Sequence, residues 1–261
     1  MSDEIIRYYD SNTRRFLRFG HGGSSGAIHR AVWAEGVENR QQAMNYVNSL
    51  VARAVSRAGA HGVLDIGCGV GGSMRYLAEH TSARLCGVTI SSVQQEAGAR
   101  YLQQAGCGDR CTIVTGDFTD PQLPQVLSKS SSLPFDAAYA IESFLHMPGA
   151  GQFFASAARL IAPGGGLLVC DDVLDDGAGR GASASTRSGI PAGRTAPGPT
   201  RRLISRFIRG WQVRSLYTFS DLKTEAETGG FTLEEVLDLT PYLELNRPRD
   251  LLIRAAVTVL G

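Results

Sequence analysis

The sequence predicts an α/β protein in which helices cover both faces of a mostly parallel sheet. From residue 62 onward, short apolar runs alternate with helical patterns, and such runs are typical of strands that are buried on both faces. The 261 residues, 43% of them hydrophobic, are enough for one large domain with a sizeable core. Glycines follow the first apolar run directly, so we expect the first strand to lead into a ligand-binding loop.

The N-terminal part, residues 1–60, is expected to be a helical cap. Apolar residues recur there at helical spacing, as at Val47, Val51 and Val55, and the turn-rich stretch at 20–26 interrupts the pattern.

The central part predicts five strands separated by helices. Ser91 and Gln94 have the spacing of a capping box, which predicts the start of a helix that ends near Gln104. The expected strands are 62–66, 84–90, 111–116, 135–141 and 166–172, and the other expected helices are 74–79 and 150–161.

The pattern changes after residue 175. Residues 176–200 are rich in Gly, Ala, Ser and Pro, which predicts a mobile insertion. Helices are expected near 201–210 and over 219–228, the second capped by Ser220, followed by strands at 234–240 and 251–260. The expected division is therefore a cap (1–60), a core (61–175), a lid-like insertion (176–217) and a C-terminal part that completes a seven-stranded sheet (218–261).

Composition argues against several classes of protein. The formal net charge of +1 gives no global basic surface for nucleic acid. No apolar run is long enough for a membrane span, and the acidic N-terminus has no signal-peptide pattern, so we expect a cytoplasmic protein. The five cysteines are scattered and do not have zinc-ligand spacing, so neither a disulfide framework nor a metal site is expected.

The strongest motif is VLDIGCGVGG at 63–72, in which Gly67, Gly69 and Gly71 let the backbone turn sharply toward the next helix. The same stretch also fits a dinucleotide fingerprint. Asp65 before the loop would oppose a pyrophosphate, and residues 87–92 offer no acid for an adenosine ribose. A ligand with adenosine, an ammonium and a carboxylate suits the loop better than NAD.

This stretch resembles motif I of the class I S-adenosylmethionine-dependent methyltransferases, which have a Rossmann-like fold, and other similarities follow in order. VTISSVQ at 88–94 resembles the cyclopropane-fatty-acid synthases, GDF at 116–118 an adenine-binding loop, and AIESFLHM at 140–147 a motif of sterol, ubiquinone and sugar methyltransferases. YYDSNTRRFLRFG at 8–20 resembles the N-terminal segment of the sterol enzymes, and LDLTPYLEL at 237–245 loosely resembles terpenoid C-methyltransferases.

The resemblance implies S-adenosyl-L-methionine as the cofactor. Asp65 would support the methionine moiety, Thr89, Ile90 and Gln94 the ribose, and Asp117 and Phe118 the adenine. The capping box alone also explains Gln94. The cofactor residues implied in this way are Tyr9, Asp65, Gly67, Cys68, Gly69, Gly71, Thr89, Ile90, Gln94, Gly116, Asp117, Phe118 and Glu142.

The catalytic candidates are His146, Glu142 and Asp171, which follow expected strand ends and should therefore lie at one edge of the sheet. His146 is a candidate base for a hydroxyl acceptor, with Asp171 or Asp172 to orient the imidazole. Glu142 would contact the substrate or cofactor, or stabilise a cation if an alkene is methylated. The alternative for His146 is that it only lines the pocket. His29 and Trp33, in the expected N-terminal cap, would either face the acceptor or pack against neighbouring residues.

Charge is segregated along the chain. Residues 177–220 hold eight arginines and no Asp, Glu or Lys, a formal charge of +8 that leaves −7 on the remainder. This block is either a solvated loop or a basic lid for an anionic acceptor.

Together these features predict a methyltransferase of specialised or isoprenoid-like metabolism. It would transfer a methyl group to a small-molecule acceptor, either to oxygen or to carbon, and could form a homo-oligomer. The alternative is a protein of the same fold that alkylates lipid alkenes or catalyses a cyclisation.

Overall fold

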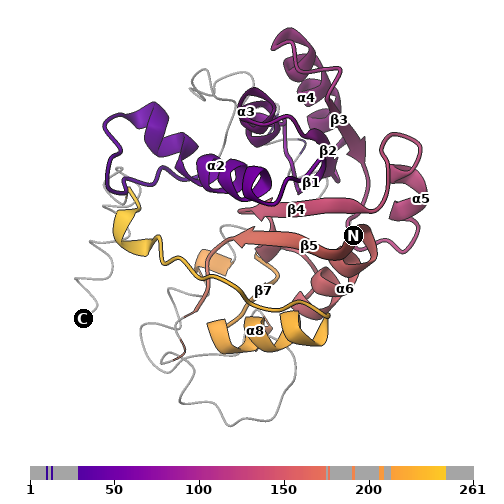
Figure 1. Ribbon diagram of the computed structural model, residues 1–261. Helices are drawn as coiled ribbons and strands as arrows, with labels where there is room; N and C mark the ends of the chain where they lie inside the picture. Colours follow the sequence, from indigo (N-terminus) through magenta and orange to yellow (C-terminus); the bar gives the residue numbers. More distant parts are fainter. Residues whose placement is uncertain are drawn as a thin grey trace.

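The computed structural model describes residues 29–174 and 213–244 together with 10, 13, 176, 190–191 and 206–208. Its central feature is a five-stranded parallel sheet in the order β3-β2-β1-β4-β5 (Figure 1). The strands are β1 (Gly62–Ile66), β2 (Arg84–Thr89), β3 (Cys111–Thr115), β4 (Phe135–Ile141) and β5 (Ile161–Cys170).

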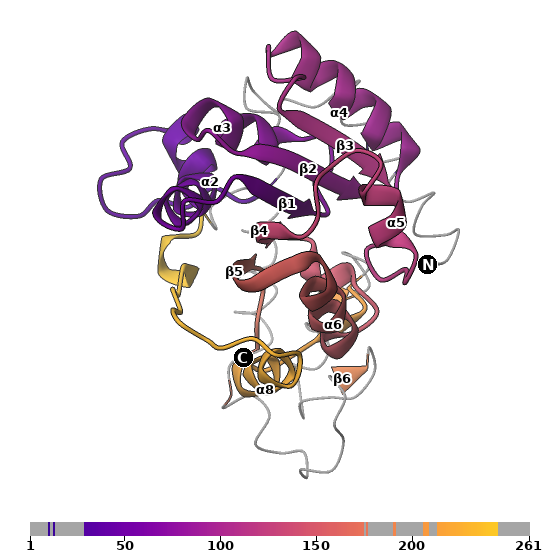
Figure 2. The ribbon, with the colours of Figure 1, turned by 45° about the vertical axis from the view of Figure 1, so that its right-hand side comes forward.

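Helices cover both faces of this sheet, as predicted (Figures 1 and 2). One face packs against α2 (Arg40–Arg57), α3 (Gly72–His80) and α4 (Ser92–Gln104); the other packs against α5 (Leu123–Leu127) and α6 (Ala150–Leu160). Successive side chains of β1 point to opposite faces of the sheet, which explains this arrangement. Val63 packs in the apolar cluster beneath α2, α3 and α4, whereas Leu64 and Ile66 pack in the cluster beneath α5 and α6. The predicted α/β architecture is therefore confirmed for the core.

An aromatic group anchors α6 on the sheet. Phe153 is completely buried, and its ring centroid lies 4.9 Å from that of Phe144 and 5.4 Å from that of Phe118. Because aromatic pairs in these orientations stabilise beyond their buried area, the cluster fixes the loops after β3 and β4 as well as the helix.

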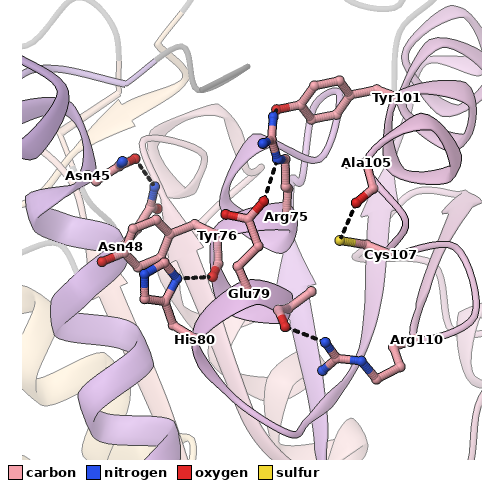
Figure 3. Close-up of polar contacts among 11 residues, drawn as sticks. Asn45, Asn48, Arg75, Tyr76, Glu79, His80, Tyr101, Ala105, Cys107 and Arg110 are labelled. Carbon is pink, nitrogen blue, oxygen red and sulfur yellow. Dashed lines mark hydrogen bonds and ion pairs between the residues drawn. The ribbon is translucent and has the colours of Figure 1, made fainter. Parts of the chain in front are cut away.

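Polar contacts tie the helices of the opposite face together (Figure 3). On α3, Arg75 donates hydrogen bonds to Glu79 at 2.7 Å and to the hydroxyl of Tyr101 on α4 at 3.0 Å. Arg110 donates to carbonyls at the end of α3, including that of Ala78, which satisfies groups that a helix C-terminus leaves open.

Two expectations about the ends of elements need correction. The regular pairing of β5 starts at Gly166, as predicted, but the strand begins at Ile161 with an irregularity near Pro163 and Gly164. The helix α8 (Phe219–Thr228) has the predicted bounds, yet its N-cap is Thr218, whose hydroxyl accepts from Asp221 N–H, and not Ser220.

The seven-stranded sheet is confirmed only in part. The predicted strand at 234–240 is wrong, because this stretch is not a strand and leaves Val236 and Leu237 more than half exposed. The predicted strand at 251–260 and most of the insertion at 176–200 lie outside the described residues. Ile190–Pro191 (β6) and Ser215–Leu216 (β7) form a separate antiparallel pair.

In the described part of the N-terminal cap, less of the chain is helical than expected. The helix α2 confirms the periodicity around Val47 and Val55, but residues 30–39 are not helical. Val32 instead forms an isolated antiparallel bridge with Leu243, which brings the C-terminal part beside the cap. No helix among the described residues has both the length and the apolar character that a membrane span requires.

Candidate functional site

The glycine loop after β1 has the geometry that the sequence predicted. Gly67, Gly69 and Gly71 have φ angles of 83°, 56° and 82°, which side chains other than glycine's rarely adopt. At Gly67 a Cβ would also lie 2.5 Å from the Cβ of Ser143, because the loops after β1 and β4 approach closely. The loop delivers the chain to α3, whose N-cap Gly71 has no side chain to cap the helix.

Asp65 lies at the end of β1 in the buried layer beneath this loop. Its carboxylate accepts a 2.7 Å hydrogen bond from the hydroxyl of Tyr139, its register neighbour on β4. Burial raises the pKa of Asp65 to about 7, although the bond from Tyr139 partly opposes the shift. A positively charged ligand group near this carboxylate would therefore relieve an unfavourable buried charge.

Cys68 and Phe118 take core positions beside the loops that hold them. Cys68 is 9% exposed, and burial raises the pKa of its thiol, which fits a small apolar role. Phe118 is 2% exposed and packs on Phe153, while Gly116 N–H donates to the Thr89 carbonyl and so joins β3 to β2.

The loop after β2 is held by a buried chain of hydrogen bonds. The Thr89 hydroxyl donates to Gln94 Oε1 at 2.6 Å, and Gln94 Nε2 donates to the Thr13 hydroxyl at 3.1 Å. Ser91 caps α4 by accepting from Gln94 N–H and donates its own hydroxyl proton to Asp10. Ser91 thus caps the helix as predicted. In a complete capping box the Gln94 side chain would bond the backbone N–H of Ser91, but here it bonds Thr89 and Thr13. Ile90, which lies between Thr89 and Ser91 in the sequence, is half-buried.

Asp117 follows β3 and accepts hydrogen bonds from the backbone N–H and the hydroxyl of Thr119. Burial raises the pKa of Asp117, whereas the bonds from Thr119, together with further electrostatic attraction, lower it, and the pKa lies below its usual value. The carboxylate is therefore ionised at neutral pH and able to accept from a donor such as an exocyclic amine.

The ends of β4 and β5 bring together Glu142, Asp171 and Asp172. Glu142 Oε1 accepts from Arg30 N–H at 2.8 Å and from Arg30 Nε at 3.2 Å, and Arg30 Nη2 lies 2.7 Å from Asp172 Oδ2. Burial lowers the pKa of Arg30, but the two carboxylates outweigh it and raise the pKa above its ordinary value. Glu142 has a φ of 47°, the one positive φ at a non-glycine residue among those described.

Asp171 contacts the backbone of the short turn that carries His146. Asp171 Oδ2 accepts from the N–H of Leu145, which directly precedes His146 in a short 3-10 turn. Burial raises the pKa of Asp171 to about 7, although this bond and a second from Asp172 N–H lower it. The carboxylate therefore holds the turn that carries the candidate base.

Other predicted residues are less well defined. Tyr9 lies outside the described residues. His29 is 8% exposed, and its Nε2 has no hydrogen-bond partner in the described part of the chain. Trp33 is 38% exposed at the surface.

Two neighbouring hollows of the described surface lie away from this edge of the sheet. The larger, of about 640 Å³, is lined by Ser56, Glu79, His80, Thr81, Ser82 and Arg110. Thr81 and Ser82 precede β2, so this hollow lies at the opposite end of the strands, and the Arg110 guanidinium there is already bonded to carbonyls (Figure 3). Ligands of open α/β sheets bind beyond the carboxyl ends of the strands, where the site above lies.

Sequence reasoning missed several contributors to the site. Tyr139 could have been found as a polar residue of a buried strand, two positions before a strand end. Arg30, Ser143, Asp10 and Thr13 carry no such signal, because each reaches a partner more than 70 residues away.

The parallel sheet, the glycine loop and the carboxylates after β1, β3 and β4 define the class of protein: a Rossmann-like domain for an adenosine-containing ligand. The family described as "Methyltransferase domain" matches residues 63–165, which span β1 to β5. Residues 63–165 of this chain are therefore similar to that family.

Relatives agree with this assignment. Sterol 24-C-methyltransferase of Yarrowia lipolytica is 31% identical over 172 residues, which is 66% of this chain and 42% of the relative. The probable tocopherol O-methyltransferase of Oryza sativa subsp. japonica is 36% identical over 107 residues, 41% of this chain and 28% of the relative. The chain spans less than half the length of these curated relatives.

Solved structures show the same fold. Geranyl diphosphate methyltransferase, in complex with GPP and sinefungin, aligns with a TM-score of 0.69 at 18% identity and covers 97% of this chain and 88% of its own. A cyclopropane synthase from Mycobacterium tuberculosis aligns with a TM-score of 0.63 at 19% identity, covering 93% and 75%.

Proposed function

We propose that this chain binds S-adenosyl-L-methionine and transfers its methyl group to a carbon of an isoprenoid-like small molecule. The observation that carries the proposal is the loop of three positive-φ glycines between buried Asp65 and the uncapped start of α3, within a matched methyltransferase domain. The cofactor supplies a methyl group on a sulfonium, which is open to direct displacement.

The residues at the carboxyl edge fit this cofactor. Asp65 is a buried carboxylate whose charge an ammonium group would balance, and the start of α3 suits a carboxylate. The loop of Thr89 and Gln94 is our candidate contact for the ribose, and Asp117 that for the adenine amine; their ordering by hydrogen bonds supports these roles. Tyr9, Cys68 and Phe118 stay predictions for cofactor contacts; the buried packing of Cys68 and Phe118 supports an indirect role.

The acceptor side favours methylation of carbon. Glu142 and Asp172 contact a single guanidinium, that of Arg30, and Asp171 lies close to both carboxylates, so carboxyl groups outnumber cations there among the described residues. Negative charge stabilises the electron-deficient carbon that forms when an alkene takes a methyl group. Glu142 is then the residue that accepts the proton lost from a carbon next to the cationic one, as the electrons of that C–H bond re-form the double bond.

Methylation of a hydroxyl is the second candidate. It would use His146 as base, held by the contact between Asp171 and the Leu145 N–H, and one relative is named a tocopherol O-methyltransferase. The sequence relatives are named methyltransferases, so we do not favour lipid alkene alkylation or cyclisation.

The finer architecture is also part of the proposal. In the described sheet β5 has a partner on one side only, so the apolar segment 251–260 is a candidate to extend the sheet. The division at 60, 175 and 217, the basic lid, a cytoplasmic location, an anionic acceptor and a homo-oligomer stay predictions.

The test is product analysis with cofactor carrying a labelled methyl group. Candidate acceptors are geranyl diphosphate, sterols with a side-chain alkene and tocopherol precursors, and mass spectrometry with NMR locates the label on carbon or oxygen. We expect a carbon-methylated product and S-adenosylhomocysteine. Binding of NAD but not S-adenosylhomocysteine would overturn the cofactor assignment, and label on oxygen would favour the second candidate.

A further inference from the structure

Glu142 is held through one of its two carboxylate oxygens. Oε1 accepts both the backbone N–H and the Nε–H of Arg30, at 2.8 and 3.2 Å. Oε2 has no hydrogen-bond partner among the described residues, and the side chain is 29% exposed. The arrangement fixes the carboxylate and leaves one oxygen available to a ligand.

Arg30 spans the ends of two neighbouring strands. Its Nε contacts Glu142 after β4, and its Nη2 contacts Asp172 after β5, at 2.7 Å. The planar guanidinium presents its donors in a fixed fork, so the two carboxylates cannot move independently while both bonds persist. A lysine, with one compact charge, cannot make both contacts in this geometry.

The backbone of Glu142 is set by the same neighbourhood. Its N–H donates to the Cys170 carbonyl at 2.8 Å, and its φ of 47° lies in the left-handed region that costs energy for a non-glycine residue. Strained backbone of this kind persists when surrounding contacts impose it, and the backbone and side-chain bonds from Arg30 are such contacts.

The titratable groups that face Glu142 come from two elements. The N-terminal segment contributes Arg30, and the end of β5 contributes Cys170, Asp171 and Asp172. The nearest titratable group on its own loop is His146. Arg30 is therefore the one cation that opposes two neighbouring carboxylates in this part of the described structure.

We propose that Arg30 is a positioning residue for the methyl-transfer step: it orients Glu142 and holds a positive charge against its carboxylate, while Asp172 divides the guanidinium between the two strand ends. The role in turnover rests on the proposed function. The effect on Glu142 itself does not, because it can be measured without cofactor or acceptor.

The experiment is a ¹³C NMR titration of the full chain with labelled glutamate, the Glu142 signal being assigned from Glu142→Gln. Replacing Arg30 by Gln removes the cation and should raise the pKa of Glu142 by about 1 or more. Asp172→Asn removes a like charge and leaves the guanidinium to Glu142, so the pKa should fall. Arg30→Lys should give an intermediate value.

A matched control is Arg40→Gln, which removes another arginine–glutamate pair, Arg40–Glu244, and should leave the Glu142 titration unchanged. A residue that only tethers the N-terminal segment would lower the melting temperature without moving the pKa in opposite directions. Equal pKa values, or shifts of the same sign, in Arg30→Gln and Asp172→Asn would overturn the inference. If Arg30→Gln does not fold, the pKa of Glu142 in Asp172→Asn tests the inference: a lower pKa supports it, and an unchanged or higher pKa overturns it.

Kinetics then test the role in the reaction. Arg30→Gln should lower kcat about 10- to 100-fold with little change in the Kd of S-adenosylhomocysteine. Opposite pKa shifts with wild-type kcat in both variants would overturn the role in turnover. Failure of the wild-type chain to bind S-adenosylhomocysteine would overturn the proposed function and leave the titration result standing.

Discussion

The pKa of each aspartate at the carboxyl edge depends on how deeply its carboxylate is buried and on how many hydrogen bonds it accepts. Asp65 is 3% exposed and has a pKa near 7, whereas Asp117, which Thr119 supplies with two hydrogen bonds, has a lowered pKa. The two aspartates differ because Asp117 is only half-buried and accepts two bonds from Thr119, whereas Asp65 is buried and accepts a single bond, from Tyr139.

The raised pKa of Asp65 predicts a pH-dependent stability of the cofactor-free protein. The folded state binds this proton more tightly than the unfolded chain, so the stabilisation present near pH 4 is lost as the pH rises to about 7. Asp171 adds a second group in the same range. We expect the free energy of unfolding to fall between pH 5 and 7, by less in Asp65→Asn. Denaturation at several pH values measures this, and identical slopes would contradict it.

The same carboxylate should matter for the cofactor. Neutralising Asp65 as Asn keeps its size but removes the charge that balances an ammonium group. We expect S-adenosylhomocysteine to bind about 10-fold or more weakly, a loss of about 1.4 kcal/mol. Calorimetric titration measures the Kd, and an unchanged value would place Asp65 outside the methionine site.

Gly67 offers a steric test of the glycine loop. Gly67→Ala meets both a positive φ and a contact of 2.5 Å with Ser143 Cβ, which should cost about 2–4 kcal/mol. Gly69→Ala is the matched control, because it meets the same backbone penalty with nothing within 4 Å. Equal losses of stability in the two variants, measured by urea denaturation, would show that the close approach to β4 is unimportant.

At the scale of elements, the start of α4 couples helix capping to the ligand edge. Ser91 caps the helix and also bonds Asp10, while Gln94 in the first turn bonds Thr89 and Thr13. One helix end therefore joins β2 to the N-terminal segment. The start of α8 has a comparable cap in Thr218, which forms a bridge with Leu174 beyond β5 and has no described bond to the loop after β2.

This difference predicts separate effects for two similar variants. Ser91→Ala and Thr218→Ala should each lower the free energy of unfolding by about 1 kcal/mol, because each removes an N-cap. Only Ser91→Ala should also weaken S-adenosylhomocysteine binding. Thermal denaturation and calorimetry measure the two effects, and equal Kd values would separate the cap from the site.

On the scale of the whole molecule, charge is divided between two regions. The stretch 177–220 carries +8 and the rest −7, and the acceptor edge holds more carboxylates than cations among the described residues. Attraction between exposed opposite charges is screened beyond about 10 Å at 0.1 M salt. A basic segment that meets an anionic acceptor should therefore be sensitive to salt.

Replacing Arg180, Arg187 and Arg194 together by Gln tests this idea. We expect a higher KM for the acceptor at low salt, a smaller difference at high salt, and an unchanged Kd for S-adenosylhomocysteine. Steady-state kinetics at two ionic strengths provide the measurement. The same KM in both proteins would make the segment a solvated linker.

The sequence by itself determined the local features of this protein. The bounds of β1 and α4, the cap at Ser91 and the turns at Gly67, Gly69 and Gly71 follow from apolar runs, a capping residue and the lack of a side chain, which act between near neighbours. These features, with the order of strands and helices, were enough to place Asp65, Thr89, Asp117 and Glu142 at one edge.

Only the tertiary structure decided which side chains meet there. Arg30 and Glu142 are 112 residues apart, and Gln94 and Thr13 are 81 apart, so no local pattern encodes either contact. The stretch 234–240 has the composition of a strand, yet a strand needs a neighbour to satisfy its backbone, and within the described chain it has none. Local chemistry sets the conformation of a segment, whereas pairing depends on where the rest of the chain packs.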